Sequence, residues 1–461
     1  MGPIWSFGDA WESLVRRAEL QKAAHSVPLF PAVSDWRLVA GGAGGWWADY
    51  ACLHFRWSEG YRGRGVWSRG GRRGRRNLRV CCYWICFDRL VILRLTRDDW
   101  VGPYAANNGG KGGMMRIDAD AHVDETDATW DYISDDDAAH KPVTVDPGMA
   151  TVPGDRRPHR LWLIDGATSR LRRWRDDVRT GTVEATRELA DVPARLAQMD
   201  ELNVDVQVIY PTLFLGGYTA RQEVEVAMTN AYNRWMADAT QTSGGRLRWV
   251  ALPSMLDIDN AIKELRIAKG HGACGVFKKG IECGRSASDP YFFPIYEEAA
   301  RLDMPICIHT GTGNPPSTGV DSGGRFNAIS AFTALAMSDI PERYPALRTG
   351  WIETGASWVP FLQADLVAKA QKLTFRPFDY KTELFDRCRF YVACDTTDDI
   401  PYILKFASED SLMIGSDYTH ADQSAELRAL DVIDRLGAEG TISSAVAKKI
   451  LDDNPRRFYG I

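Results

Sequence analysis

From Arg116 to the end of the chain, short apolar segments typical of strands alternate with amphipathic segments typical of helices. This alternation indicates parallel βα units, because a helix crosses over from each strand to the next. Eight strand segments fit the pattern, and the region supplies the roughly 250 residues that a closed eight-stranded barrel needs. We therefore predict an α/β fold, a (β/α)8 TIM barrel, over residues 115–461. An open doubly wound sheet is the alternative, but no GxGxxG turn follows the first strand.

The predicted elements follow one another along the chain. Strands are predicted at residues 116–123, 204–211, 247–253, 273–278, 305–310, 347–354, 390–395 and 412–417. Helices are predicted at residues 193–202, 221–242, 258–269, 292–302, 358–372, 399–406, 424–436 and 443–458. A long insertion, residues 124–186, follows the first strand, and residues 160–170 within it predict a hairpin around Asp165 and Gly166. Because loops after barrel strands lie at the mouth, we expect this insertion to form a lid or a substrate wall.

The first 114 residues differ from the remainder in charge and composition. They carry a formal charge of +8 against −13 for the remainder, and they hold nine of the 16 Trp residues and an Arg/Gly-rich run at 62–79. We interpret them as a disordered extension or an artefact of a start site placed too far upstream. A small accessory domain and a nucleic-acid-binding arm are the alternatives. We predict that the folded domain begins near Met115 and that the chain has no nucleic-acid partner.

The cysteine pattern and hydropathy indicate a soluble protein of a reducing compartment. The nine Cys residues form neither a paired metal-binding motif nor a disulfide framework. The most apolar stretch, residues 80–95, is interrupted by Asp88, Arg89 and Arg94. It is also shorter than the about 20 apolar residues that a membrane span needs. We therefore expect a cytoplasmic location and no membrane partner.

Polar side chains end several predicted strands, which is where a TIM barrel builds its active site. Asp120 and His122 are two residues apart on the first strand, so both side chains point to one face. His309 ends the fifth strand and Asp417 ends the eighth. Histidine and carboxylate ligands without a thiolate suit Zn²⁺, Mn²⁺ or Fe²⁺. These four residues are therefore our candidate metal ligands.

Other polar groups near these strand ends allow more than one interpretation. Glu353 ends the sixth strand and is a candidate ligand, a bridge between two metals, or an anchor for a helix N-terminus. His420, with Asp422 beyond it, is a candidate ligand or acid. Asp118 shares the face of the first strand's ligands but lies earlier. Lys278 ends the fourth strand, and we expect it to be exposed or ion-paired rather than a carbamylated bridging ligand.

Five motifs occur in order between residues 115 and 461. They are IDADAHV, PICIHTGTG, GWIETGASWVP, LMIGSDYTH and the ending DDNPRRFYG. As an ordered set they resemble the amidohydrolase-related family of metal-dependent hydrolases and non-oxidative decarboxylases. The resemblance implies that a divalent metal is held by Asp120, His122, His309 and Asp417. The chain departs from the family at Glu353, where members commonly have a His that orients water or protonates substrate.

The resemblance implies a metal-dependent hydrolase acting on a small carboxylate, ester, lactone or amide substrate. Asp417 would take a proton from the attacking water, with Glu353 and His420 as further catalytic candidates. A non-oxidative decarboxylase of an aromatic or unsaturated acid is the first alternative. A dinuclear metal hydroxylase is the second, because Glu353 and His420 leave room for a second metal. We expect zinc, with manganese or iron as alternatives, a small-molecule substrate and a homodimer. A barrel without catalysis is disfavoured, because the four candidate ligands are intact.

Overall fold

The computed structural model describes the side chains of residues 114–145, 160–167, 177–315, 324–372 and 378–461, together with the backbone of further strands. The chain divides into two compact units, Met1–Asn108 and Gly109–Ile461. The first unit contains an antiparallel sheet whose strands pair in chain order: β1 (Val33–Gly41), β2 (Tyr50–Trp57), β3 (Arg62–Val66), β4 (Val80–Cys86) and β5 (Arg89–Leu95). Our interpretations of the N-terminal extension otherwise fall outside the described residues and stay predictions.

The second unit is a (β/α)8 barrel, as the alternating pattern predicts. Eight parallel strands pair in chain order: β6 (Ile117–Val123), β10 (Val206–Pro211), β11 (Leu247–Ala251), β12 (Ala273–Lys278), β15 (Ile306–His309), β16 (Thr349–Ile352), β17 (Phe390–Cys394) and β18 (Leu412–Ile414). The barrel closes where the chain after β18 pairs with β6, because Asp417 N donates to Asp120 O at 2.9 Å and His122 N to Tyr418 O at 2.9 Å. All eight predicted strands are therefore confirmed.

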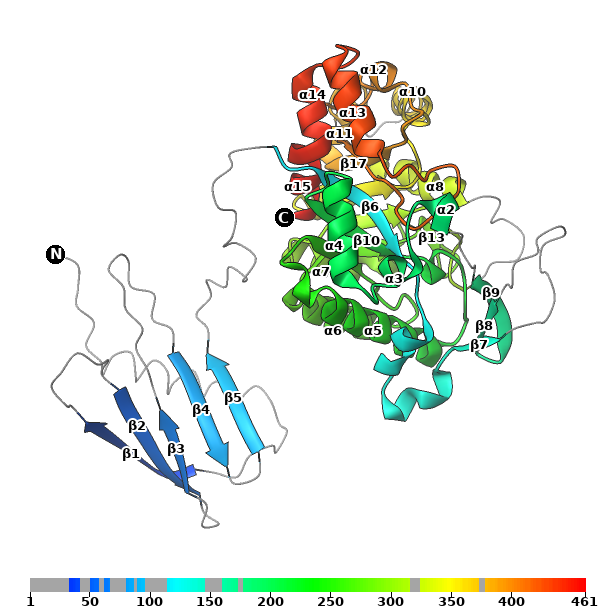
Figure 1. Cartoon of the computed structure of the whole chain (residues 1–461). Coiled ribbons are helices and arrows are strands. Elements are labelled where there is room, and N and C mark those ends of the chain that lie inside the picture. Colours follow the sequence, from blue (N-terminus) through cyan, green and yellow to red (C-terminus); the bar gives the residue numbers. More distant parts are fainter. Residues whose placement is uncertain are drawn as a thin grey trace, which may run out of the picture. The chain divides into compact units, whose positions relative to one another are not determined.

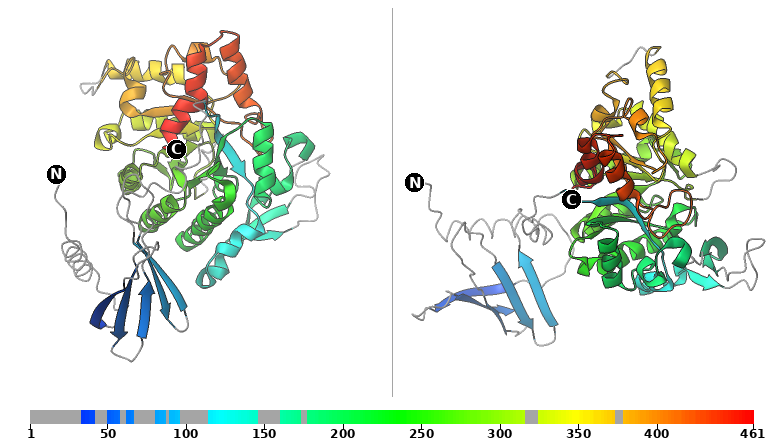
Figure 2. Two further views of the ribbon diagram at one scale, coloured as in Figure 1. Left: turned by 60° about the vertical axis from the view of Figure 1, so that its left-hand side comes forward. Right: turned by 45° about the horizontal axis from the view of Figure 1, so that its top comes forward.

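The helices lie outside these strands. Those from the first part of the barrel sequence (green) and those from the later part (yellow to red) cover different sides of the barrel (Figures 1 and 2). The longer ones are α4 (Val192–Glu201), α5 (Gln222–Ala239), α6 (Ile258–Gly270), α7 (Phe293–Arg301), α8 (Gly324–Ala336), α10 (Val359–Ala370) and α13 (Ala429–Ala438). The shorter ones are α2 (Asp177–Thr180), α3 (Glu184–Arg187), α9 (Ile340–Arg343), α11 (Leu384–Cys388), α12 (Ile400–Ile403), α14 (Ser444–Lys448) and α15 (Asn454–Tyr459). Within the described part of the chain, no helix is long and apolar enough to cross a membrane.

Local sequence explains where several helices begin. The Asp257 side chain accepts a hydrogen bond from Asn260 N at the start of α6, and Ser443 does the same for Val446 N at the start of α14. Helix α8 was not among our predicted helices. Its apolar residues are not confined to one stripe, so the helical period is weak there.

The insertion after β6 is anchored to the barrel. It contains β7 (Val143–Val145), β8 (Arg160–Ile164) and β9 (Ala167–Arg172), and the predicted hairpin is confirmed, with Asp165 and Gly166 both at positive φ. Trp162 is buried and packs edge-to-face on Trp130 at 5.7 Å between ring centroids. At the hairpin tip, Arg221 Nη1 donates to Asp165 Oδ1 at 2.7 Å. These contacts hold the hairpin against the segment that leads into α5, and a role as a lid or a substrate wall stays a prediction.

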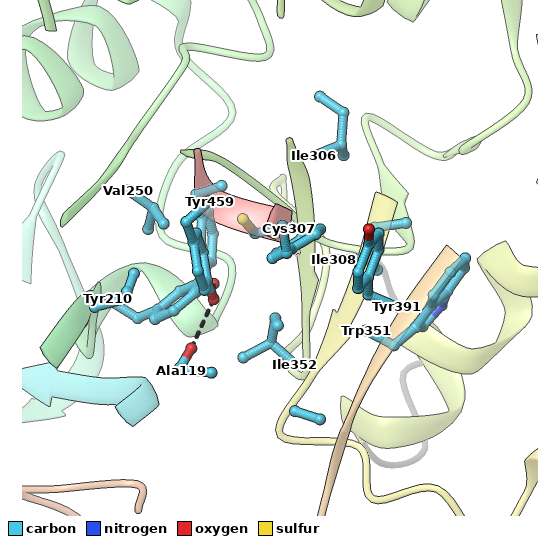
Figure 3. Close-up of a cluster of buried hydrophobic side chains, with 14 of the residues drawn as sticks. Ala119, Tyr210, Val250, Ile306, Cys307, Ile308, Trp351, Ile352, Tyr391 and Tyr459 are labelled. Atoms are coloured by element: carbon cyan, nitrogen blue, oxygen red, sulfur yellow. Dashed lines mark hydrogen bonds between the residues drawn. The ribbon is translucent and has the colours of Figure 1, made fainter. Parts of the chain in front are cut away.

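Aromatic residues fill the barrel interior below the strand ends. Tyr459, from the C-terminal helix α15, donates its hydroxyl to Ala119 O at 2.6 Å, and its oxygen lies 2.6 Å from the Tyr210 hydroxyl (Figure 3). Tyr210 in turn lies 5.0 Å from the His309 ring, centroid to centroid. The end of the chain therefore forms a packed floor beneath His309.

Candidate metal centre

Six of the residues selected from the sequence meet, buried, at the C-terminal ends of the barrel strands. Asp120, His122 and His309 lie on β6 and β15, and we call them the strand group. Glu353, Asp417 and His420 follow the ends of β16 and β18, and we call them the turn group. Ligand atoms of the strand group lie within 4.8 Å of one another, and those of the turn group lie within 4.8 Å of one another and of His122.

Regular strand geometry and backbone carbonyls orient the strand group. Asp120 Oδ1 lies 3.4 Å from Nε2 of both His122 and His309. The His122 Nδ1 lies 2.9 Å from Pro211 O, and the His309 Nδ1 lies 2.9 Å from Thr310 O. Because a carbonyl oxygen only accepts hydrogen bonds, each Nδ1 carries the proton. When the ring is neutral, each Nε2 then keeps a lone pair directed at the site, as in histidines that bind metals.

The charges of the strand group are coupled. Burial opposes ionisation of Asp120, but the neighbouring His309 and His122 more than offset it and hold the pKa of Asp120 below its ordinary value. Burial also lowers the pKa of His122, which keeps this imidazole neutral. For His309 the effect of burial is outweighed by the Asp120 carboxylate, so its pKa is raised. A cation at this position would take over the role of the His309 proton.

The turn group is held by turns with unusual backbone conformations. Glu353, Asp417 and Thr419 have φ values of 57°, 52° and 85°, in the left-handed region. Such residues persist only where the surrounding structure holds them, and they are frequent at functional sites. Asp417 Oδ1 lies 2.7 Å from His420 Nδ1 and 3.5 Å from His122 Nε2. The turns thus place a carboxylate beside the strand group.

His420 connects Asp417 to the loop after β10. Its Nε2 lies 3.1 Å from the Thr212 hydroxyl, on the opposite side of the ring from Asp417. Its ring stacks on His122 with centroids 4.0 Å apart. Asp417, His420 and Thr212 therefore form a chain of polar groups that can orient the Asp417 carboxylate.

Glu353 is buried among charges. Its Oε1 accepts a hydrogen bond from the Ser424 hydroxyl at 3.0 Å, and its Oε2 lies 3.5 Å from His309 Nδ1. Burial raises its pKa to about 8; His309 opposes this, and the charges of Asp120 and Asp422 reinforce it. The Oε2 atom of Glu353 and the Nε2 atom of His122 are buried without a hydrogen-bond partner among the described residues. Buried polar atoms of this kind call for a partner, and a divalent cation suits both.

A pocket opens directly onto both groups. Its lining consists of Asp120, Glu353, Ala393, Cys394, Asp395, Gly415, Asp417 and Ser424. Gly415 is required for the close approach of β18 to β6, because a Cβ at this position would lie 2.2 Å from the Asp120 Cβ. Three carboxylates of the centre, Asp120, Glu353 and Asp417, therefore line this pocket.

Three of the residues considered from the sequence lie outside the centre. The Asp118 carboxylate accepts from Ser416 N and Oγ and from Gln207 Nε2. Pairing between β6 and β10 is irregular after Asp118. The Asp118 side chain therefore does not point to the same face of the strand as those of Asp120 and His122. The Lys278 ammonium lies over the Phe292 ring at 4.0 Å and 3.6 Å from Glu282 Oε2, which confirms the ion-paired interpretation. Asp422 is exposed, although its Oδ1 accepts from the Ser424 hydroxyl at 2.6 Å.

Sequence reasoning missed several residues of the site. Thr212, Ser424 and Asp395 all follow strands and carry polar side chains, so the rule that found Asp417 could also have found Asp395 and Thr212. Ser424 lies ten residues beyond β18, and only the folded turn brings it to Glu353. No signal in the sequence relates Tyr210 to the C-terminal Tyr459.

Comparisons with known proteins agree with this architecture. A search of curated proteins found no match. The amidohydrolase family model matches residues 117–461. A crystal structure of an amidohydrolase from Mycobacterium avium subsp. paratuberculosis K-10 is similar with a TM-score of 0.58 and 18% identity, covering 76% of this chain and 98% of that one.

Two 5-carboxyvanillate decarboxylases are also similar in structure. The Sphingomonas paucimobilis protein has a TM-score of 0.53 and 16% identity, covering 76% of this chain and 100% of that one. The Novosphingobium aromaticivorans protein, complexed with manganese and 4-hydroxy-3-methoxy-5-nitrobenzoic acid, has a TM-score of 0.54 and 18% identity, covering 77% of this chain and 98% of that one. Likeness at this level of identity shows the barrel fold. The family match, which spans the whole barrel, shows more: the chain belongs to the amidohydrolase family of enzymes.

Proposed function

We propose that this chain is a metal-dependent hydrolase of a small carboxylate, ester, lactone or amide. The observation that carries the proposal is the buried arrangement of Asp120, His122 and His309, with the Asp417 carboxylate 3.5 Å from His122 Nε2. Two imidazole Nε2 atoms and two carboxylates form a donor set that suits zinc, our first choice. Manganese also suits it, and manganese is present in the similar Novosphingobium structure.

In this proposal Asp417 is the general base. A divalent ion bound here would polarise a substrate carbonyl and lower the pKa of a water molecule toward about 7. Asp417 takes the proton of the attacking water and passes it to the leaving group. His420, 2.7 Å from Asp417 and 3.1 Å from Thr212, keeps the carboxylate oriented during both transfers. The packed floor beneath His309 limits the entry of bulk water from below.

Decarboxylation of an aromatic or unsaturated acid is the second candidate. It is favoured by one observation: two of the similar barrels are decarboxylases of a carboxylated aromatic ring. In this chain, Asp417 in its protonated form would deliver a proton to the ring carbon that loses CO2. The same residues therefore serve either reaction, and only the products separate them.

A dinuclear metal hydroxylase is the third candidate, favoured by the second set of ligands. His122, Glu353, Asp417 and His420 offer ligand atoms within 4.8 Å of one another. The raised pKa of Glu353 shows that its charge is poorly compensated by the protein alone. A second cation held through Glu353 would compensate this buried charge.

Metal analysis combined with a product screen tests these candidates. Purified protein would be analysed for metals, and then assayed for hydrolysis of esters, lactones and amides and for CO2 release from aromatic carboxylates. We expect one zinc or manganese per chain and hydrolysis without CO2 release. CO2 release alone would favour the decarboxylase, and two irons per chain the hydroxylase. A chain that binds no divalent metal even after reconstitution would rule out all three. The expected homodimer stays a prediction.

A further inference from the structure

One basic side chain is hydrogen-bonded to a residue that lines the pocket and takes no part in the proposed reaction. Arg325 is the second residue of α8, in the connection between β15 and β16. Its Nη1 donates to Asp395 Oδ2 at 2.8 Å. Asp395 follows β17 and lines the pocket together with Asp120, Glu353 and Asp417. The Arg325 guanidinium is therefore linked to the pocket through the Asp395 carboxylate.

The second terminal nitrogen of Arg325 lacks a partner. Its Nη2 is buried and has no hydrogen-bond partner among the described residues. A buried, charged donor left unpaired costs free energy, so native structures rarely retain one without a reason. The Arg325 side chain as a whole is 30% exposed, so a ligand can reach part of this side chain, whereas Nη2 itself lies beneath the surface. The unpaired nitrogen therefore indicates a position that a ligand completes.

Packing fixes where this guanidinium lies. A Cβ at Gly324 would be 2.6 Å from Gly311 N, so the start of α8 presses on the loop that follows His309. A Cβ at Gly355 would be 2.9 Å from Asp395 Oδ2 and 3.5 Å from Arg325 Nη1. Gly355 comes two residues after Glu353, so the Arg325–Asp395 pair lies against the turn that holds Glu353. The pair is therefore positioned relative to the metal ligands.

The charge of the pocket defines what Arg325 would bind. The described residues that line it include four carboxylates and no Lys or Arg. A divalent cation offsets the charge near Asp120 and Asp417, but an anionic group elsewhere on a substrate needs a cation of its own. The two terminal nitrogens of a guanidinium form a fork that matches the two oxygens of a carboxylate.

We propose that Arg325 binds a carboxylate of the substrate through Nη2, beside Asp395 and away from the reacting group. The inference rests on the proposed function, which it sharpens by naming the substrate class: a molecule with one group that reacts at the metal and a separate carboxylate. Asp395 holds Arg325 in place in the free enzyme and shares it with the ligand in the complex. Arg325 and Asp395 are thus specificity determinants, and neither is a metal ligand.

Calorimetric titration of the metal-loaded protein tests this assignment. The probes are malonate, glutarate and isophthalate, each compared with its monomethyl ester, which keeps one carboxylate for the metal and removes the second. We expect at least one dicarboxylate to bind the wild type about tenfold or more tightly than its monoester, as one charge-assisted hydrogen bond allows. Arg325→Gln should abolish this preference and Arg325→Lys should retain part of it. Arg343→Gln, which removes an exposed Arg paired with Asp339, is the matched control and should change nothing.

Variants of Asp395 distinguish a ligand-binding role of Arg325 from a purely structural one. Asp395→Asn removes the carboxylate that competes for Arg325, so the dicarboxylate preference should increase. The double variant Arg325→Gln/Asp395→Asn removes both charges, and it should bind dicarboxylates as weakly as Arg325→Gln. If Arg325 only balances Asp395, the double variant will instead recover wild-type binding, and the proposal is wrong. It is also wrong if no probe distinguishes wild type from Arg325→Gln.

Metal content keeps this test independent of the proposed function. Every variant should hold as much metal as the wild type, because neither residue is a ligand. A wild-type protein that takes up no metal contradicts the proposed function itself. A metal-loaded protein without a dicarboxylate preference contradicts only the role of Arg325.

Discussion

The strand group and the turn group face the same pocket but are built in different ways. Asp120, His122 and His309 lie on regular strands, and their histidines are oriented by backbone carbonyls. Glu353, Asp417 and His420 lie in turns beyond strand ends, where Glu353 and Asp417 have left-handed backbone conformations. The difference teaches that regular strand geometry positions one side of the centre, whereas on the other side turns hold Glu353 as a buried carboxylate whose pKa is raised by burial and then by neighbouring charges.

Removing a member of the strand group should have the largest effect. In His309→Ala the Nε2 donor is lost, so we expect the protein to lose its metal and all measurable activity. Metal analysis and activity assays on the same sample check this. His271→Ala, which removes an exposed His after α6, is the matched control and should keep both. Full metal content in His309→Ala would show that the strand group is not the ligand set.

The turn group should respond differently at Asp417. Asp417→Asn keeps the size of the side chain but removes its basicity, so we expect metal to remain while kcat falls by roughly 10²–10⁴-fold, the usual range for a general base. Steady-state kinetics and metal analysis together distinguish this from loss of a ligand. Near-normal turnover in Asp417→Asn would exclude Asp417 as the base.

Glu353 tests the comparison most directly, because this member of the turn group lies 3.5 Å from His309 of the strand group. We expect Glu353→Gln to lower metal affinity or turnover by about 10- to 100-fold, as changes to groups that orient metal ligands commonly do. Loss of one of two bound metals would show that Glu353 carries a second ion. Equal metal content and equal turnover in both proteins would show instead that Glu353 only anchors the turn.

Glu125 should have a smaller effect, a pH-dependent change in stability. It contacts the loop that carries Thr212, the partner of His420. Its carboxylate accepts from Thr212 N at 3.0 Å and Leu213 N at 2.8 Å, and burial raises its pKa from 4.5 to about 7. Between those two pH values the folded state holds a proton that the unfolded state has released. Stability contributed by this group therefore falls as pH rises from about 4.5 to about 7, by roughly 3 kcal/mol.

Urea unfolding of wild type and Glu125→Gln between pH 5 and pH 8 measures this contribution. The variant should gain stability relative to wild type as pH rises to about 7, and the difference should level off above that pH. Both proteins share the metal centre, so its own pH dependence cancels from the comparison. Parallel stability curves over this range would mean that Glu125 does not hold its proton.

Removal of the N-terminal unit should have the smallest effect on either group. A chain that begins at Met115 retains every described residue of the centre, so we expect the same metal content, activity and unfolding midpoint as the full chain. Differential scanning calorimetry and metal analysis check this. A shortened chain that unfolds or loses its metal would show that the first 114 residues support the barrel.

The sequence by itself determined the barrel and one half of its centre. Alternating strand and helix patterns are local properties, so all eight strands were predictable from them. The spacing of Asp120 and His122 predicts a shared face because side chains alternate along a regular strand. Strand ends pointed to His309, Glu353 and Asp417, because this fold collects such positions at one mouth.

Only the tertiary structure decided which neighbours these residues have. The irregular pairing after Asp118 takes this residue out of the face that simple alternation assigns to it. Left-handed turns direct Glu353 and Asp417 at the strand group. The packing of α8 brings Arg325 to Asp395, 70 residues later in the chain. The reason is that alternation is set by bonds between adjacent residues, whereas contacts across a barrel depend on strand pairing and helix packing between segments far apart in sequence.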